Sequence, residues 1–211
     1  MILKSLKRWL WIVVLCGLLP LLSWAENLRV VHLGDSHVWS KIFPRAAHAR
    51  LRQRLGGGVS YQHIAKPGAY LADFLNQRSV NKVAALSPNL LVVSIGTNES
   101  YAPNFDAPKF RADMRRFMAM YRPVCRAILF TTMPGNYKKG QVNPKGRQIA
   151  DIQIALAKEL GYWVYDLYGA AGPVYWRRGG MMDRRGIHFN AKVYSQQGTM
   201  LGDWIVDNVM R

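Results

Sequence analysis

Short apolar runs alternate with longer amphipathic segments along most of this chain, and this alternation constrains its fold more than any other feature. Runs rich in Val, Leu and Ile predict strands, whereas apolar residues spaced three and four apart predict helices. Strands are expected at 28–33, 59–64, 90–95, 127–132 and 162–167, and helices at 43–55, near 70–77, and at 109–122, 148–160 and 191–210. Strands separated by helices imply a parallel sheet with right-handed crossovers. The sequence therefore predicts one three-layer α/β/α domain with a mostly parallel five-stranded sheet.

The first 25 residues are predicted to be a signal peptide and not part of this domain. Basic residues precede position 9, residues 9–22 are almost wholly apolar, and Ser23-Trp24-Ala25 offers small residues before the expected cleavage site. An apolar run of about 14 residues is short beside the roughly 20 that a spanning helix needs, so an uncleaved membrane anchor is the less favoured alternative. Residues 26–211 then form the domain, and a periplasmic or secreted location is expected.

The chain is strongly basic, with 29 Lys and Arg against 12 Asp and Glu and a formal net charge of +17. No nucleic-acid partner is expected, because the predicted signal directs the protein out of the cytoplasm. The cations are spread along the chain, so two interpretations stay open: solvated surfaces, or peripheral contact with an anionic envelope. Cys125 is the single cysteine beyond the predicted signal and is expected to be a buried core residue, with no internal disulfide. The oligomeric state is not predicted.

Three polar motifs follow the first three predicted strands. Gly34-Asp35-Ser36-His37 follows the first strand, Gly68 the second, and Gly96-Thr97-Asn98-Glu99 the third. Each motif alone is typical of an ordinary turn, and Ser36 alone is typical of a helix cap. The carboxyl ends of parallel strands meet at one edge of a sheet, where such sheets bind their ligands. Together the three motifs predict one site with a serine nucleophile.

A late histidine supplies the base that a serine nucleophile needs. His188 stands just before the last predicted helix, where it can reach the same edge of the sheet. His32, His48 and His63 lie within predicted strands or a helix and are expected to be core or surface groups, and His37 is expected to point away from Ser36. The histidines are scattered and no Cys/His spacing recurs, so neither a metal nor a cofactor is expected.

Gly34-Asp35-Ser36-His37, Gly68, Gly96-Thr97-Asn98 and His188 resemble, in this order, the four conserved blocks of the SGNH (GDSL-type) hydrolases. The resemblance covers about residues 28–204 and implies a flavodoxin-like SGNH hydrolase fold, with Ser36 as nucleophile and His188 as base. It also implies an oxyanion hole made by the backbone N–H groups of Ser36 and Gly68 and the side chain of Asn98. Asp35 is expected only to support its loop.

One position departs from the family pattern. The family usually places an aspartate three residues before the histidine, but position 185 is an arginine and the nearest aspartate is Asp183. Several arrangements stay open: Asp183 reaches His188 through a bulged loop, a backbone carbonyl holds the ring in a Ser–His dyad, another carboxylate acts, or the site is degenerate. The choice matters because a wrongly held tautomer costs a triad protease about 10⁴ in rate.

Within the superfamily, Gly96-Thr97-Asn98-Glu99 and His188-Phe189-Asn190 are similar to the exported peptidoglycan O-acetylesterases and related glycan deacetylases. The first hypothesis is therefore an exported serine esterase that removes O-acetyl groups from a cell-envelope glycan, peptidoglycan first, through an acetyl-serine intermediate. One alternative is an acetyltransferase or another lipid or acyl esterase on the same fold. Another is a non-catalytic glycan-binding envelope protein, which Arg185 favours.

Aromatic residues on predicted loops are candidates to face a sugar, and two basic segments are candidates to bind sugar carboxylates. The aromatic candidates are Tyr70, Tyr101, Tyr137 and Trp176, and the basic segments are 138–147 and 177–185. Each is more typically a packing or surface group, so these assignments depend on where the fold places them.

Overall fold

The computed structural model describes residues 27–132, 137–138, 141–170 and 187–211, and its centre is a five-stranded parallel sheet. The strands are β1 (Leu28–Gly34), β2 (Val59–Ala65), β3 (Leu90–Ser94), β4 (Ala127–Thr131) and β7 (Trp163–Tyr165). Their order is β2-β1-β3-β4-β7, and all four pairings are parallel. The predicted fold class is confirmed. A separate antiparallel pair, β5 (Tyr137–Lys138) and β6 (Gln141–Val142), lies beyond the sheet.

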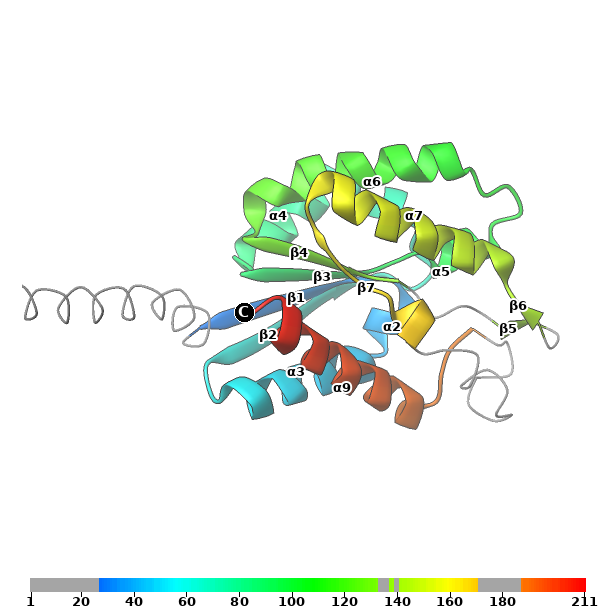
Figure 1. The fold of residues 1–211 in the computed structure, drawn as a ribbon. Helices are drawn as coiled ribbons and strands as arrows, with labels where there is room; N and C mark the ends of the chain where they lie inside the picture. The colour runs from blue at the N-terminus through cyan, green and yellow to red at the C-terminus, as the bar shows by residue number, and fades with distance from the viewer. Residues whose placement is uncertain (1–26, 133–136, 139–140, 171–186) are drawn as a thin grey trace, which may run out of the picture.

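Helices cover both faces of the sheet, as Figure 1 shows. Helices α3 (Ile42–Leu55) and α9 (Ala191–Asn208) cover one face, and α4 (Gln77–Ala85), α6 (Ala107–Tyr121) and α7 (Pro144–Leu160) cover the other. Side chains of a strand alternate between faces, so β1 sends Val31 and Leu33 into one core and Leu28 and Val30 into the other. Both faces are buried, which explains the continuous apolar runs. No helix in the described ranges is both long and apolar enough to cross a bilayer.

Helices α3 and α9 pack closely and run in the same direction. A Cβ atom at Gly198 would lie 2.3 Å from the Phe43 carbonyl oxygen, and one at Gly202 would lie 2.7 Å from Cβ of Arg50. Only glycine fits at such a close approach of two helices. These contacts join the middle of α9 to the first half of α3, and so fix the position of the loop before α9.

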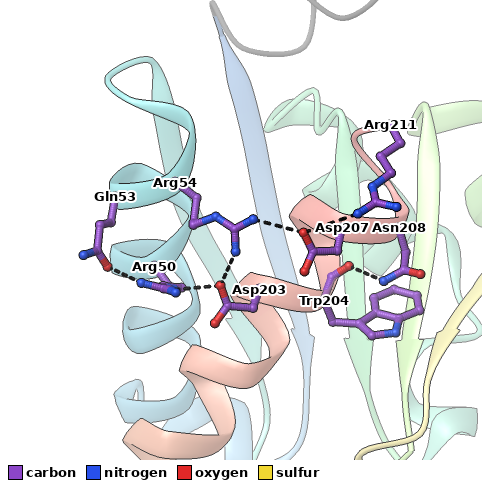
Figure 2. A network of polar contacts seen from close by, with 8 residues as sticks. All are labelled: Arg50, Gln53, Arg54, Asp203, Trp204, Asp207, Asn208 and Arg211. Carbon is purple, nitrogen blue, oxygen red and sulfur yellow. Dashed lines mark hydrogen bonds and ion pairs between the residues drawn. The ribbon is translucent and has the colours of Figure 1, made fainter.

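Ion pairs connect the far ends of the same two helices (Figure 2). Arg50 Nε lies 2.8 Å from Asp203 Oδ1, and Arg54 contacts Asp203 at 2.6 Å and Asp207 at 3.0 Å. Arg211 lies 3.9 Å from Asp207. These side chains are about one-third exposed or more, so each pair is worth at most about 1 kcal/mol. The network neutralises cations at the end of α3 that lies away from the carboxyl ends of the strands.

The prediction of a helix near 70–77 was wrong. This segment is a 3-10 turn, η1 (Leu71–Phe74), and the α-helix begins only at Gln77. The side chain of Asn76 accepts a hydrogen bond from Ser79 N at 2.9 Å, which caps α4 and ends the preceding turn. Two short helices were not predicted: α2 (Ser36–Trp39) and α5 (Thr97–Tyr101). Each follows a strand directly and is too short to show a hydrophobic period.

Side-chain caps also explain the helix boundaries that differ from prediction. Helix α6 begins at Ala107 because Asp106 Oδ1 accepts from Lys109 N at 2.9 Å. Helix α7 begins at Pro144, four residues before the predicted start, and Asn143 Oδ1 accepts from Lys145 N at 3.0 Å. Proline is favoured at the first helical position, because an N–H there would have no partner within the helix and because the fixed φ of proline suits a helix.

Candidate active site

Ser36 is held at the edge of the sheet by a tight turn from β1 into α2. A Cβ atom at Gly34 would lie 2.3 Å from the Ser94 carbonyl oxygen of β3 and 2.7 Å from Cγ2 of Val38 in α2, so only glycine fits there. The next residue, Asp35, is fully buried, and its Oδ1 accepts a hydrogen bond from His37 N at 2.9 Å. Asp35 therefore caps α2, the short helix that begins with Ser36 and was not predicted.

The structure places the predicted base beside the predicted nucleophile. Nε2 of His188 lies 2.8 Å from Oγ of Ser36, across 152 positions of sequence, and both residues are half-buried. His188 stands in the loop before α9, and Asn190 Oδ1 caps that helix by accepting from Val193 N at 3.0 Å. This distance lies within the range of a hydrogen bond, so a serine proton can pass directly to the imidazole.

His37 packs beneath His188 and was not predicted to belong to the site. Its ring is buried, and its Nδ1 lies 2.8 Å from Oη of Tyr194 in α9. The ring centroids of His37 and His188 are 5.4 Å apart. Tyr194 follows His37 by 157 positions, so no local pattern in the sequence could have paired them. The contact limits how the His188 ring can turn.

The three predicted loops meet at one edge of the sheet. Gly34 pairs in register with Ala65 of β2 and with Ser94 of β3, so all three strands end at the same level. Lys66 N donates to the Gly34 carbonyl at 3.1 Å, which brings the Gly68 loop against the end of β1. Gly68 has a φ of +76°, a conformation that favours glycine.

Asn98 lies in α5, against the Gly68 loop. Its Nδ2 donates to the Ala69 carbonyl oxygen at 2.8 Å, which fixes the plane of the amide. An amide nitrogen carries two hydrogens, and this bond uses one of them. The other hydrogen is therefore available to a ligand oxygen at the edge of the sheet. Ser36, Gly68 and Asn98 thus come from three neighbouring strand ends, which is the arrangement that the resemblance implied.

Two buried carboxyl groups lie behind these loops. Oε1 of Glu99 accepts from Leu71 N, so Glu99 holds the loop that Asn98 also contacts. Burial raises the pKa of Glu99 to about 7. Burial also raises the pKa of Asp35 to about 7, and the nearby charge of Glu99 contributes to this increase. Desolvation disfavours the charged form of each acid. The two carboxyl groups that hold the loops of the site, those of Asp35 and Glu99, therefore have pKa values near neutral pH.

Other predicted or excluded groups have structural roles. Oδ1 of Asp166 accepts from Thr132 Oγ1 at 2.8 Å and from Gly169 N at 2.9 Å, so it supports the turn after β7. Cys125 is half-buried rather than fully buried, and burial raises the pKa of its thiol to about 12. Such a thiol is a poor nucleophile at neutral pH. Within the described ranges, no three His, Cys, Asp or Glu side chains are grouped so as to hold a metal ion.

Some predicted residues fall outside the described residues. Asp183, Arg185 and Trp176 do, as does the basic segment 177–185. Of the remaining aromatic candidates, Tyr70 is 43% exposed and follows the Gly68 loop, whereas Tyr101 is half-buried at the end of α5.

A cavity of about 200 Å³ adjoins the Gly68 loop. It lies between the loop after β2, α5 and the start of α6. Most of its exposed lining is apolar, from residues that include Tyr70, Ala102, Phe105 and Phe110. Polar and charged residues also line it: Glu99, Asn104, Asp106, Lys109 and Asp113. Pockets for whole ligands are usually about 300–1,000 Å³, so this cavity fits one group of a larger ligand.

The site geometry agrees with the comparison with known families. The model of the GDSL-like lipase/acylhydrolase family matches residues 32–196. The chain belongs to this family. It is therefore a serine ester hydrolase of the SGNH type, and the resemblance stated from its four motifs is confirmed.

Solved structures share the fold of this GDSL-like hydrolase at low sequence identity. A peptidoglycan O-acetylesterase has a TM-score of 0.78 at 14% identity, covering 91% of this chain and 94% of the other. An acetylxylan esterase from Geobacillus stearothermophilus has a TM-score of 0.70 at 12% identity, covering 86% and 95%. A lipase/acylhydrolase from Enterococcus faecalis has a TM-score of 0.66 at 18% identity, covering 84% and 95%. No curated protein matches the sequence of this GDSL-like hydrolase.

Proposed function

We propose that this protein is an exported O-acetylesterase of a cell-envelope glycan, with peptidoglycan as the first candidate substrate. The contact of 2.8 Å between Ser36 Oγ and His188 Nε2 carries the proposal, because it supplies a serine with a base at the edge where Gly68 and Asn98 lie. Two similar structures are esterases of acetylated glycans by name, which supports the choice of acetyl ester and glycan.

The proposed reaction proceeds in two acyl-transfer steps. Ser36 Oγ attacks the carbonyl carbon of the acetyl ester while His188 Nε2 takes its proton. The N–H groups of Ser36 and Gly68 and the amide of Asn98 hold the negative oxygen of the tetrahedral intermediate. As the intermediate collapses, His188 gives the proton to the sugar oxygen, which leaves as a hydroxyl group. Water then loses a proton to His188 and attacks the acetyl-serine, which releases acetate and restores Ser36.

The proposal also concerns the group that orients the His188 ring. The variant Asp183→Asn distinguishes an Asp183 carboxylate from a backbone carbonyl in this role. If the Asp183 carboxylate holds the ring, Asp183→Asn lowers kcat by up to about 10⁴, as in the protease example. If a backbone carbonyl holds the ring, the same variant changes kcat by less than about tenfold. Arg185→Ala serves as the matched control in the same segment, and both variants are compared on one aryl acetate.

The nucleophile is tested with Ser36→Ala. We expect this variant to keep the circular dichroism spectrum and melting temperature of the wild type and to lose acetate release from O-acetylated peptidoglycan. A serine-directed phosphonate should label wild-type protein once, at Ser36, and leave the variant unlabelled. Unchanged acetate release would remove Ser36 from the mechanism, and a folded wild type that resists the phosphonate would favour a glycan-binding role.

Export is proposed from residues 1–25 alone. Expression of the full chain in a Gram-negative host, followed by cell fractionation, should give a periplasmic protein whose first residue is Glu26. Mass spectrometry of the purified protein measures this directly. A product that keeps residues 1–25 and stays with the membrane fraction would instead support the anchor.

The apolar cavity beside Tyr70 supports a second candidate, an esterase of longer acyl chains on the same serine. Aryl esters with acyl chains of two to twelve carbons distinguish the candidates. An acetylesterase should show the highest kcat/KM with acetate, whereas the second candidate requires an increase with chain length. Ala102→Trp, which fills the cavity, should abolish that increase.

A transferase is recognised by faster acetyl transfer to sugar hydroxyls than to water.

A further inference from the structure

Cations at the two ends of helix α3 have different surroundings. At the far end, Arg50 and Arg54 pair with Asp203 and Asp207 of α9 (Figure 2). At the end near Ser36, Lys41 and Arg45 are both exposed, and within the described ranges neither has a carboxylate at ion-pair distance. The reason lies in α9, which runs parallel to α3 and has no acidic residue between positions 191 and 202. Among the described residues, no carboxylate therefore pairs with the cations at this end of α3.

These cations are connected to the nucleophile by a short stretch of chain. Lys41 N donates to the Val38 carbonyl at 3.0 Å and so closes α2, the helix that begins with Ser36. Lys41 has a φ of +65°, an unusual conformation for a residue with a side chain. The intervening Trp39 is 58% exposed, more than any other large hydrophobic residue in the described ranges. An exposed aromatic residue and two exposed cations thus follow the catalytic serine within nine positions, at the end of α2 and the start of α3.

The edge strand β2 extends this surface. The rings of Tyr61 and His63 stack with centroids 5.9 Å apart, and both residues are half-buried. Burial and the charges of Lys41 and Arg45 lower the pKa of His63. The charges of Lys41 and Arg45 are therefore felt at the edge strand β2.

We propose that Trp39, Lys41 and Arg45 bind a carboxylate-bearing glycan strand while its acetyl ester reaches Ser36. An exposed aromatic ring offers an apolar face for a sugar ring, and the arginine fork matches a carboxylate. Uncompensated cations also attract an anionic strand from solution. The inference rests on the proposed function and narrows its substrate to acetylated glycans that carry carboxylates. These carboxylates can come from peptide or lactyl groups of peptidoglycan or from uronates.

The test compares two double variants that remove equal charge. Lys41→Ala/Arg45→Ala changes the proposed surface, and Lys82→Ala/Arg116→Ala removes two exposed cations from α4 and α6 on the other side of the sheet. The substrates are O-acetylated muropeptides with free carboxylates, the same muropeptides after amidation, and acetylated xylooligosaccharides with and without glucuronate. Each kcat/KM is divided by that for an aryl acetate, which cancels changes in the catalytic residues.

We expect the first double variant to lower the normalised kcat/KM for free-carboxylate substrates about tenfold, as two surface ion pairs can do. Amidated muropeptides and neutral xylooligosaccharides should change less than about twofold. The wild-type preference for carboxylates should vanish in 1 M NaCl, where the Debye length is roughly 3 Å. Trp39→Ala should lower the values for all glycans alike. A preference for muropeptides over glucuronate substrates, or the reverse, identifies the source of the carboxylate.

Several results would overturn the inference. The first is an equal loss of normalised kcat/KM in the two double variants. The second is a wild type that hydrolyses free-carboxylate and amidated muropeptides equally well. The third is a first double variant that keeps its normalised kcat/KM on glycans and loses only its binding to anionic phospholipid vesicles. If the wild type hydrolyses aryl acetate but no glycan, the proposed function fails by itself. The surface is then tested by calorimetric titration of unacetylated muropeptides into the wild type and the first variant, and equal affinities refute it.

Discussion

Gly34 is the position where one added methyl group should affect both the fold and the site. In Gly34→Ala the new Cβ would lie 2.3 Å from the Ser94 carbonyl oxygen and 2.7 Å from Cγ2 of Val38. Normal contact therefore requires a shift of about 1 Å. The carbonyl belongs to β3, whose spacing from β1 is set by hydrogen bonds at about 4.8 Å, so strand separation is costly. The alternative is a shift of α2, which carries Ser36.

The expected magnitude follows from these two contacts. Overpacking of a dense core lowers the free energy of unfolding by about 1–3 kcal/mol. Gly34→Ala should lie near the upper value, because one of the two contacts is with a backbone atom, the Ser94 carbonyl oxygen. For a domain of this size a loss of about 3 kcal/mol lowers the melting temperature by roughly 6–12 °C. A shift of Ser36 by about 1 Å should reduce kcat/KM for an aryl acetate about a hundredfold.

The assay combines urea unfolding with hydrolysis of the aryl acetate. Gly57→Ala is the matched control, because a Cβ there meets no atom within 4 Å. We expect the control to be unchanged or up to about 1 kcal/mol more stable. If Gly34→Ala unfolds at the same urea concentration as the control and keeps full activity, the close approach of β1, β3 and α2 is refuted.

Two further predictions concern buried polar groups. Because the folded pKa of Asp35 is raised to about 7, its ionisation opposes folding, and its contribution to stability should decrease as pH rises from about 4 to about 7 and then level off. Buried His32, whose pKa is lowered to about 3, acts in the opposite sense over much of this range, so the prediction concerns the difference between a variant and the wild type. Relative to the wild type, Asp35→Asn should become more stable as pH rises from about 4 to about 7, measured by urea unfolding of both proteins at pH 4 to 8. An unchanged slope would show that Asp35 does not titrate in this range. Tyr194→Phe removes the hydroxyl beside His37 Nδ1 and should cost about 1 kcal/mol, with a shifted pH profile of kcat/KM. Loss of stability with an unaltered pH profile would mean that His37 does not influence His188.

Local patterns were sufficient for most of the fold. Apolar runs located the five strands, and glycines and helical periods located most helices, because these signals depend on neighbours a few positions apart. The prediction of a helix near 70–77 was wrong because Asn76 caps a helix that begins at Gln77. Helix propensity alone does not predict this capping contact. The starts of α6 and α7 were misplaced for the same reason.

The chemical groups of the site could be predicted from short motifs: a serine after β1, glycine and asparagine after the next two strands, and a late histidine. Parallel strands end at one edge, so the site could be located in advance, and the distance of 2.8 Å between Ser36 and His188 agrees with that inference. The packing of His37 against His188 could not be predicted, and neither could the neutralisation of one end of α3 by α9. Such contacts join residues more than 140 positions apart, and they depend on how two helices pack rather than on any local pattern.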